Sequence, residues 1–265
     1  MYTRIESADN RKLKLIRKLS SRKHRDALGK YVIEGINLVE EAIRKNADIE
    51  FVVASEDFES DRLDAIRGSI GETHLVGRDI YEKISDAENG SGVIAVVRRS
   101  YDRDRVIASI DTGDNVLVLD RVQDPGNIGT MIRTAVAAGY RAVLLIKGCA
   151  DIYSPKVLRA TAGMIFNLPV LFADDASEAV NILHELGLRV FVTEPEAKLA
   201  YYETDLSSGA ALVIGNEGRG VSEELASLAD ERITLPMEGS VESLNAAVAA
   251  AILMYERIRR KTLER

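Results

Sequence analysis

Three short segments of the chain combine glycine or proline with polar side chains. Each segment starts at or directly after the last residue of an apolar run that predicts a β-strand. The segments are residues 120–129, 214–222 and 235–245. Ligand sites of open α/β sheets form at the carboxyl ends of strands. The three segments therefore predict a ligand site that offers amide, carboxylate and hydroxyl groups.

The first and third segments also contain residue types that begin helices. Pro125 and Gly126 favour a tight turn, Asn127 is the expected N-cap of the next helix, and Arg133 falls in its second turn. In the third segment, Ser243 and Asn245 open the final helix. A capped helix with a surface arginine would explain these residues without catalysis, so each segment alone is a weak signal.

The middle segment has three glycines within six residues, which permit close backbone approach and positive φ angles. Its spacing is G-x-x-G-x-G instead of the dinucleotide fingerprint G-x-G-x-x-G, and it lacks the Gly-Lys-Ser/Thr of a Walker loop. This spacing disfavours an unrelated nucleotide-binding enzyme such as a dehydrogenase. The histidines and the single cysteine have no ligand-like spacing, so we expect no metal site.

The apolar pattern that must position these segments alternates between strands and helices, which indicates α/β architecture in two parts. A charged, weakly periodic stretch predicts a linker at residues 99–113, between a first domain at 1–98 and a second at 114–265. Strands are predicted at residues 31–33, 51–54, 74–76, 93–97, 116–119, 143–146, 189–193, 211–214 and 233–235, and helices around 13–19, 36–45, 60–70, 78–85, 128–136, 174–186 and 244–258.

The charge of the chain is unevenly placed. Its formal net charge is −7, but residues 1–30 contain ten Lys/Arg and three acidic residues, so they carry +7 and the remainder carries −14. A local basic stripe can hold a polyanion whatever the net charge of the protein. A solvated helix face is the alternative explanation. The expected phosphate-binding residues are Arg11, Lys12, Lys14, Arg22, Lys23 and Arg25.

The remaining composition bounds the location of the protein. With 46% hydrophobic residues in 265, the chain can bury a sizeable core. One cysteine excludes an intrachain disulfide and suits a reducing compartment. The start does not resemble a signal peptide, and no apolar run reaches the roughly 18 residues of a membrane span. We therefore expect a cytoplasmic protein with no membrane partner.

Taken in order, the three segments resemble the SpoU (TrmH-like) family of RNA ribose methyltransferases, in the SPOUT superfamily. The shared motifs read N-I-G-x-x-I-R-T, I-G-N-E-G-x-G and L-P-M-x-G-x-V-x-S-L-N, and the resemblance covers residues 114–265. The first part is similar to a small α/β, ribosomal-protein-like substrate-binding domain, through its basic start and the sequence Val32-Ile33-Glu34-Gly35. The resemblance implies a SPOUT α/β domain with a C-terminal trefoil knot, active as a homodimer whose subunits share each active site.

The resemblance also implies a reaction and roles for residues. S-adenosylmethionine would donate a methyl group to a ribose 2′-hydroxyl. The separate N-terminal domain favours ribosomal RNA as the substrate, by analogy with the family. The resemblance implies that Arg133 is the base, but a guanidinium stays protonated and is a poor base, so we expect Arg133 instead to clamp a phosphate and stabilise the oxyanion. The implied catalytic set is Asn127, Arg133, Glu217, Ser243 and Asn245, and the implied cofactor-binding set is Thr193, Gly215, Asn216, Gly218, Leu235, Met237 and Leu244. Two alternatives stay open: a transfer-RNA 2′-O-methyltransferase, and a non-catalytic RNA-binding or ribosome-assembly protein of the same fold.

Overall fold

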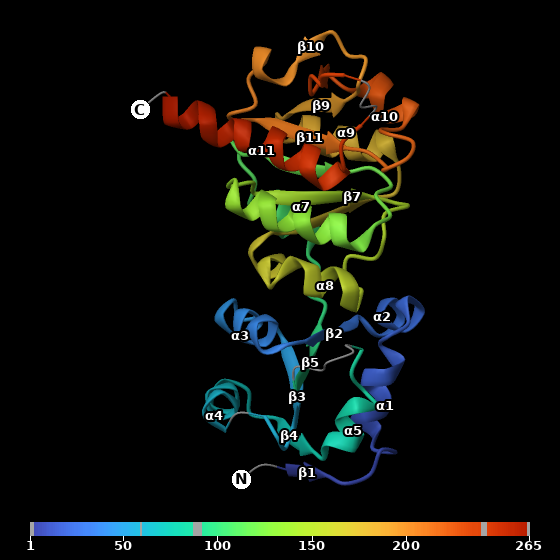
Figure 1. Ribbon diagram of the computed structural model, residues 1–265, viewed down its shortest axis with the longest axis vertical. Coiled ribbons are helices and arrows are strands. Elements are labelled where there is room, and N and C mark those ends of the chain that lie inside the picture. The colour runs from blue at the N-terminus through green and yellow to red at the C-terminus, as the bar shows by residue number, and fades with distance from the viewer. Residues whose placement is uncertain (1–2, 59, 87–91, 240–242, 264–265) are drawn as a thin grey trace. The chain divides into compact units, whose positions relative to one another are not determined.

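A computed structural model describes residues 3–58, 60–86, 92–239 and 243–263. Contacts within the chain divide it into two compact units (Figure 1). Unit 1 comprises Met1–Tyr101 and Asp151–Asn167, and unit 2 comprises Asp102–Ala150 and Leu168–Arg265. The expected domain boundaries stay a prediction, to which the structure adds that segment 151–167 packs with unit 1.

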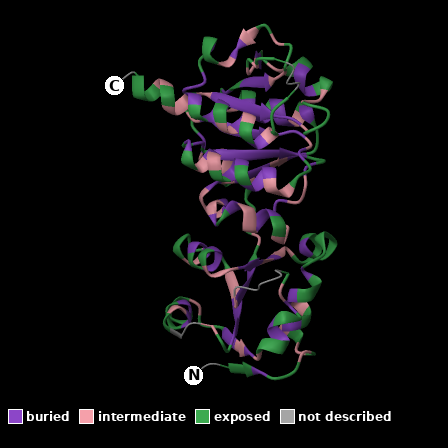
Figure 2. Cartoon of the chain, in the orientation of Figure 1, coloured by how far each residue is buried: buried purple, intermediate pink, exposed green. Residues whose placement is uncertain are grey.

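Unit 1 is built on a mixed five-stranded sheet in the order β1-β4-β3-β5-β2. The β1–β4 and β4–β3 pairs are parallel, whereas β5 pairs antiparallel with both β3 and β2. The strands are β1 (Thr3–Ile5), β2 (Lys30–Glu34), β3 (Ile49–Ser55), β4 (Thr73–Val76) and β5 (Val93–Arg98). Their apolar residues supply much of the unit's core, seen as buried strand positions in Figure 2.

Helices cover this sheet and complete its core. The helix predicted near residues 13–19 is α1, whose Leu13, Ile16 and the following Leu19 are buried, and Asn10 caps it through a hydrogen bond from Lys12 N to its Oδ1. The other helices of the first part are α2 (Arg22–Leu28), α3 (Ile36–Arg44), α4 (Ser60–Ser69) and α5 (Arg78–Glu82), beside α1 (Arg11–Lys18).

Segment 151–167 contributes α8 (Pro155–Thr161) and a 3-10 turn, η1 (Met164–Asn167), to unit 1. The Arg25 guanidinium on α2 donates to Asp151 Oδ2 from Nε (2.9 Å) and Nη2 (2.6 Å), and both side chains are largely buried. Asn167 Nδ2 donates to Glu41 Oε1 at 2.6 Å, and the rings of Tyr31 and Tyr153 lie 4.8 Å apart. These contacts tie the segment to α2, α3 and β2.

Unit 2 is an all-parallel seven-stranded sheet in the order β10-β12-β9-β11-β6-β7-β8. Near-continuous apolar strands indicate that helices cover both faces. The strands are β6 (Val116–Leu119), β7 (Ala142–Ile146), β8 (Val170–Ala173), β9 (Arg189–Thr193), β10 (Leu199–Ala200), β11 (Ala210–Ile214) and β12 (Glu231–Thr234). The helices are α6 (Arg103–Ile107), α7 (Pro125–Ala137), α9 (Ala176–Glu185), the 3-10 turn η2 (Tyr201–Glu203), α10 (Glu223–Leu228) and α11 (Ala246–Leu263).

The α/β class predicted from the sequence is confirmed for both units. The long elements lie where the apolar periodicity places them, and β6 and β9 match their predicted ranges. Elements absent from the prediction are β1, α2, α6, α8, β8, β10 and α10, of which α6 falls within the expected linker. In the part of the chain that the structure describes, no helix combines the length and apolarity needed to cross a bilayer.

Candidate active site

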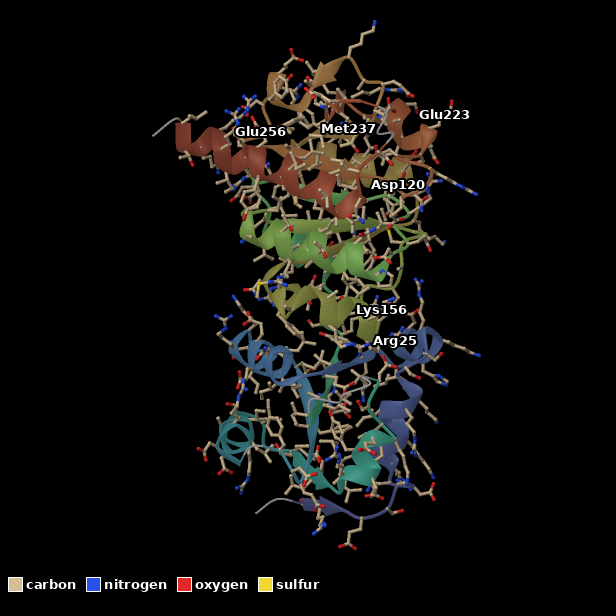
Figure 3. The ribbon with its side chains drawn as sticks, in the orientation of Figure 1. Arg25, Asp120, Lys156, Glu223, Met237 and Glu256 are labelled. Atoms are coloured by element: carbon tan, nitrogen blue, oxygen red, sulfur yellow. The ribbon has the colours of Figure 1, made fainter. Side chains whose placement is uncertain are left out.

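A pocket of about 400 Å³ opens in unit 2, where the loops after β9, β11 and β12 meet the start of α11. Met237, labelled in Figure 3, belongs to the loop after β12. All seven residues expected to bind the cofactor line this pocket: Thr193, Gly215, Asn216, Gly218, Leu235, Met237 and Leu244. Two of the three predicted segments, 214–222 and 235–245, line this cavity together with the loop after β9, as their position at the strand ends predicted, whereas no residue of segment 120–129 lines it.

The loop after β11 closes tightly on itself. Asn216 and Gly220 exchange two backbone hydrogen bonds of 2.9 Å, and the Asn216 Oδ1 accepts from the backbone N of Gly218 and Arg219 at 3.1 Å. A Cβ atom at Gly215 would lie 2.2 Å from the backbone C of Gly220. Only glycine fits at position 215, because that distance is far below van der Waals contact.

A chain of hydrogen bonds joins three of the expected catalytic residues. Asn127 Nδ2 donates to Glu217 Oε1 at 3.0 Å, and Asn245 Nδ2 donates to Asn127 Oδ1 at 3.0 Å. Glu217 also accepts from the backbone N of Gln123 (3.2 Å) and Asp124 (3.1 Å). Partial burial opposes ionisation of Glu217, but the hydrogen bonds from Asn127 and the backbone outweigh it and lower the pKa of the carboxyl below 4.5.

The helix starts differ in one respect from the sequence prediction. The N-cap of α7 is Asp124, whose Oδ1 accepts from Asn127 N at 2.7 Å, and Pro125 takes the first helical position. The expectation that Asn127 is the cap was wrong, because Asp124 has the same capping ability and precedes the proline. Asn127 is instead buried in the first turn. Asn245 does cap α11, since its Oδ1 accepts from Ala247 N (2.9 Å) and Val248 N (3.2 Å).

Arg133 and Ser243 lie outside the hydrogen-bond chain. Ser243 is exposed and lines the pocket, next to Ser240, Val241 and Glu242 of the third motif, which lie outside the described residues. Arg133 is exposed on α7, does not line the pocket, and makes no hydrogen bond or ion pair with any residue that the structure describes. Its guanidinium is therefore free to bind an anion.

Sequence reasoning missed several residues that build the site. Asp120, at the end of β6, is buried, and its Oδ2 accepts from Ser222 N at 2.6 Å, so it fixes the end of the glycine-rich segment (Figure 3). Glu194, Pro195 and Leu253 line the pocket beside the predicted residues. An acidic residue at the end of an apolar strand was the available signal for Asp120.

The basic residues of unit 1 divide into free and paired groups. Arg11 and Lys23 are exposed and form no ion pair within the described part of the chain. Lys12 pairs with Glu72 (2.6 Å), Lys14 with Asp9 (3.0 Å) and Arg22 with Asp26 (3.6 Å). These three pairs are at least partly exposed, and solvated pairs of this kind are weak and can be exchanged for phosphate contacts.

Arg25 corrects the expected RNA-binding set. Its side chain is only 6% exposed. Besides the two bonds to Asp151, its Nη1 donates to the carbonyl oxygens of Leu19 and Ser20, both at 2.7 Å. The guanidinium is fully used inside unit 1, so Arg25 has a structural role.

Two further observations concern reactive groups. Cys149 is buried, which raises the pKa of its thiol to about 11, so no thiolate nucleophile is present at neutral pH. Over residues 3–58, 60–86, 92–239 and 243–263, no group of three His, Cys, Asp or Glu side chains is arranged to hold a metal ion.

Comparison with known proteins identifies the family. The model of the SpoU rRNA Methylase family matches residues 114–255, and that of the MRM3-like substrate binding domain matches residues 10–95. The 23S rRNA (guanosine(2553)-2'-O)-methyltransferase RlmP of Bacillus subtilis (strain 168) is 36% identical over 251 residues, covering 95% of this chain and 97% of that protein.

Solved structures give the same result. The AdoMet-bound rRNA methyltransferase from Sinorhizobium meliloti has a TM-score of 0.88 at 28% identity, covering 98% of each chain. The SpoU methyltransferase AviRb from Streptomyces viridochromogenes, in complex with AdoMet, has a TM-score of 0.86 at 25% identity, covering 96% of this chain and 100% of that one. The chain therefore belongs to the SpoU rRNA methylase family, as its three motifs predicted.

Proposed function

We propose that the protein transfers a methyl group from S-adenosylmethionine to a ribose 2′-hydroxyl of ribosomal RNA. One observation carries the proposal: the seven residues expected to bind the cofactor line a pocket that adjoins the hydrogen-bonded residues Asn127, Glu217 and Asn245. Glu217 belongs both to this pocket and to the hydrogen-bonded group. The 23S rRNA specificity of RlmP and the bound AdoMet of two similar structures support the same reaction.

The residues of the pocket fit S-adenosylmethionine. Leu235, Met237 and Leu244 are only partly covered, and they offer apolar surface to an adenine ring and a thioether. The closed loop at 215–220 presents backbone where a side chain could not fit. When bound, the cofactor supplies an electrophilic methyl group on a positively charged sulfur.

The protein's own residues would orient the nucleophile and stabilise its charge. Asn127 uses both ends of its amide within the protein, so we assign it, with Asn245, to positioning the loops. Ser243 lines the pocket and is free to donate to the ribose. Arg133 would clamp the adjoining phosphate and stabilise the 2′-oxygen as its proton passes to that phosphate or to water.

The assembly that we propose is a homodimer. One side of α11 exposes Val248 (50%), Ile252 (38%) and Tyr255 (49%), preceded by Leu244, while Ala247, Ala250, Leu253 and Met254 on its other side are buried. Residues spaced by four and three positions form one continuous face of a helix. A second copy of the chain would cover this face. Arg133 does not line the pocket of its own chain, so in the dimer each copy would supply Arg133 to the pocket of the other copy.

We further propose a C-terminal trefoil knot and a cytoplasmic location. The knot is supported by the family and by the path of the chain, which goes from β12, next to β9, back to α11 against α7 and β11. The location is supported by the proposed substrate and by a single, buried cysteine.

The proposal is tested by incubating the purified protein with methyl-labelled S-adenosylmethionine and unmodified ribosomal or transfer RNA, then identifying the labelled nucleoside. We expect a 2′-O-methyl nucleoside from ribosomal RNA. Arg133→Ala and Arg133→Lys should each lose at least about tenfold in kcat, with Arg105→Ala, another exposed arginine of unit 2, as the control. Near-full activity of Arg133→Lys would disprove a clamp in which the guanidinium donates two hydrogen bonds to the phosphate. Label in a base would change the assigned reaction. Label only in transfer RNA would change the assigned substrate.

A further inference from the structure

A second pocket, of about 230 Å³, lies within unit 1 and takes no part in the proposed methyl transfer. It is formed by α1, β2, the end of α5 with the turn after it, and α8. Its lining residues are Ile16, Arg17, Ser20, Val32, Glu34, Lys83, Ile84, Ser85, Asp86, Pro155 and Arg159. The volume is close to that of one nucleobase with its sugar and is too small for the drug-sized ligands of typical cofactor sites.

The floor of this pocket is a fixed carboxylate. Glu34, of the Val32-Ile33-Glu34-Gly35 sequence, is only 8% exposed. Its Oε1 accepts from Tyr81 Oη at 3.2 Å and from Ser85 Oγ, and its Oε2 accepts from Asp86 N at 3.0 Å. A carboxylate has about four acceptor positions, and these hydrogen bonds occupy three of them. The floor is therefore rigid and retains capacity to accept one N–H group.

The walls and the rim differ in character. The apolar side chains of Ile16, Val32, Ile84 and Pro155 line the walls, and of these Ile16 and Ile84 are largely buried in the core of unit 1. Arg17 and Lys83 are exposed at the rim, and Arg159 is partly exposed. Arg17 donates to the Ala8 carbonyl oxygen at 2.7 Å but pairs with no carboxylate in the described ranges. Arg159 pairs with Asp86 at 3.2 Å, and Lys83 is 4.0 Å from Asp79.

We propose that this pocket binds one unpaired nucleotide of the RNA substrate, with its base against the apolar walls above Glu34 and its phosphate held by Arg17. The inference rests on the proposed function, because it assumes an RNA substrate. Sequence-specific RNA recognition targets unpaired bases, which form hydrogen bonds through their polar edges. A base taken out of its stack can also pack between aromatic or apolar side chains. A guanidinium at the rim suits a phosphate, since it can donate two parallel hydrogen bonds.

Segment 151–167 is needed for this pocket, because Pro155 and Arg159 lie on α8. The same segment joins β7 to the adjacent strand β8 of the catalytic sheet. A nucleotide in the pocket would thus contact residues that are covalently continuous with unit 2. The basic surface of α1 alone would not provide this.

Two matched pairs of variants of the full chain test the proposal. Arg17→Ala removes one of the positive charges at the rim, and Lys18→Ala removes a neighbouring exposed charge outside the pocket. Ser20→Phe fills the pocket without altering charge, and Ser21→Phe adds the same ring beside it. The measurements are the Kd for unmodified ribosomal RNA by filter binding, the Kd for S-adenosylmethionine by calorimetry, and thermal melting as a check on folding.

We expect Arg17→Ala and Ser20→Phe to weaken RNA binding on the order of tenfold, because the first removes a charge-assisted phosphate contact and the second excludes the nucleotide, and to leave cofactor binding unchanged. The two controls should stay within about threefold, the effect of a single surface charge. The pocket proposal would be overturned if Arg17→Ala and Lys18→Ala weakened RNA binding equally while Ser20→Phe had no effect on it. RNA would then bind only through the basic surface. If the wild type binds RNA with the expected pattern but transfers no methyl group, the pocket stands and the proposed function fails.

Discussion

At the scale of single residues, the polar side chains of the motifs serve mainly to hold the site together. Asn127, Glu217 and Asn245 come from three separate segments and are linked by hydrogen bonds of 3.0 Å. Glu217 and Asn245 also bind backbone groups: Glu217 receives two N–H groups before α7, and Asn245 caps α11. Because the hydrogen bonds of a connected network polarise and position one another, we expect these residues to act as a unit.

The Glu217 carboxylate gives a pH-dependent prediction. A carboxyl whose pKa is lower in the folded than in the unfolded protein stabilises the fold above its unfolded value of 4.5, and this stabilisation is lost as pH falls through the folded value. Glu217→Gln should therefore lower the Tm at neutral pH, and its deficit relative to wild type should shrink as the solution is acidified below 4.5. A Tm difference that is constant from neutral to acidic pH would contradict the role of the charge.

Gly215 gives a steric prediction. In Gly215→Ala the new Cβ would meet the Gly220 backbone at 2.2 Å, so the loop that bounds the proposed cofactor pocket must open. Overpacking of this kind costs about 1–3 kcal/mol, and we expect S-adenosylmethionine affinity to fall by about tenfold or more in calorimetry. Gly218→Ala is the matched comparison, since its Cβ would lie 3.9 Å from Asn216 Oδ1, an ordinary contact distance, and it should lose much less. Equal losses would show that the close approach is not the cause.

The residues also show what a sequence can and cannot predict. The motifs and the family resemblance together were sufficient to name seven residues that line one pocket at the ends of β9, β11 and β12. They were insufficient for Arg25, which lies in a basic run like its neighbours and differs only because Asp151, far along the chain, packs on it. Tertiary partners of this kind leave no local signal.

At the scale of elements, the Arg25–Asp151 pair should hold α8 in unit 1. Breaking a buried pair by removing one partner costs about 3–5 kcal/mol, because the other charge is left without compensation. We expect Arg25→Ala to shift the first urea-unfolding transition to lower denaturant, with Lys23→Ala, an exposed residue of the same helix, unchanged. If both variants unfold like wild type, the segment is held by its other contacts.

Elements were predictable in proportion to their length and periodicity. The helices α3, α7 and α11 and the buried strands of unit 2 were expected because their apolar residues repeat over many positions. The helices α2, α6, α8 and α10 have five to seven residues, too few for a repeat to emerge, although α5, which has five, was predicted. Segment 151–167 was assigned to the second part because sequence adjacency was the only guide, and its packing with unit 1 depends on distant residues.

At the scale of the whole molecule, the exposed face of α11 predicts self-association. Val248→Glu and Ile252→Glu together should convert a dimer to a monomer, because each would leave a carboxylate desolvated within the apolar contact. Light scattering after size exclusion measures the mass directly. Leu228→Glu makes the same change at an exposed leucine of a different helix, α10, and should leave the dimer intact. A wild-type monomer would rule out the shared active site.

Unit 1 is built from two separate stretches of the chain, and this affects the order in which the protein can fold during its synthesis. A ribosome releases residues 102–150, with β6, α7 and β7, before Asp151–Asn167 becomes available. At ordinary translation rates, this interval lasts about 2–10 s. During that time the guanidinium of Arg25 lacks its carboxylate, and the pocket above Glu34 lacks the side chains of Pro155 and Arg159. The amino-terminal unit therefore matures late, and its final closure coincides with the growth of the catalytic sheet.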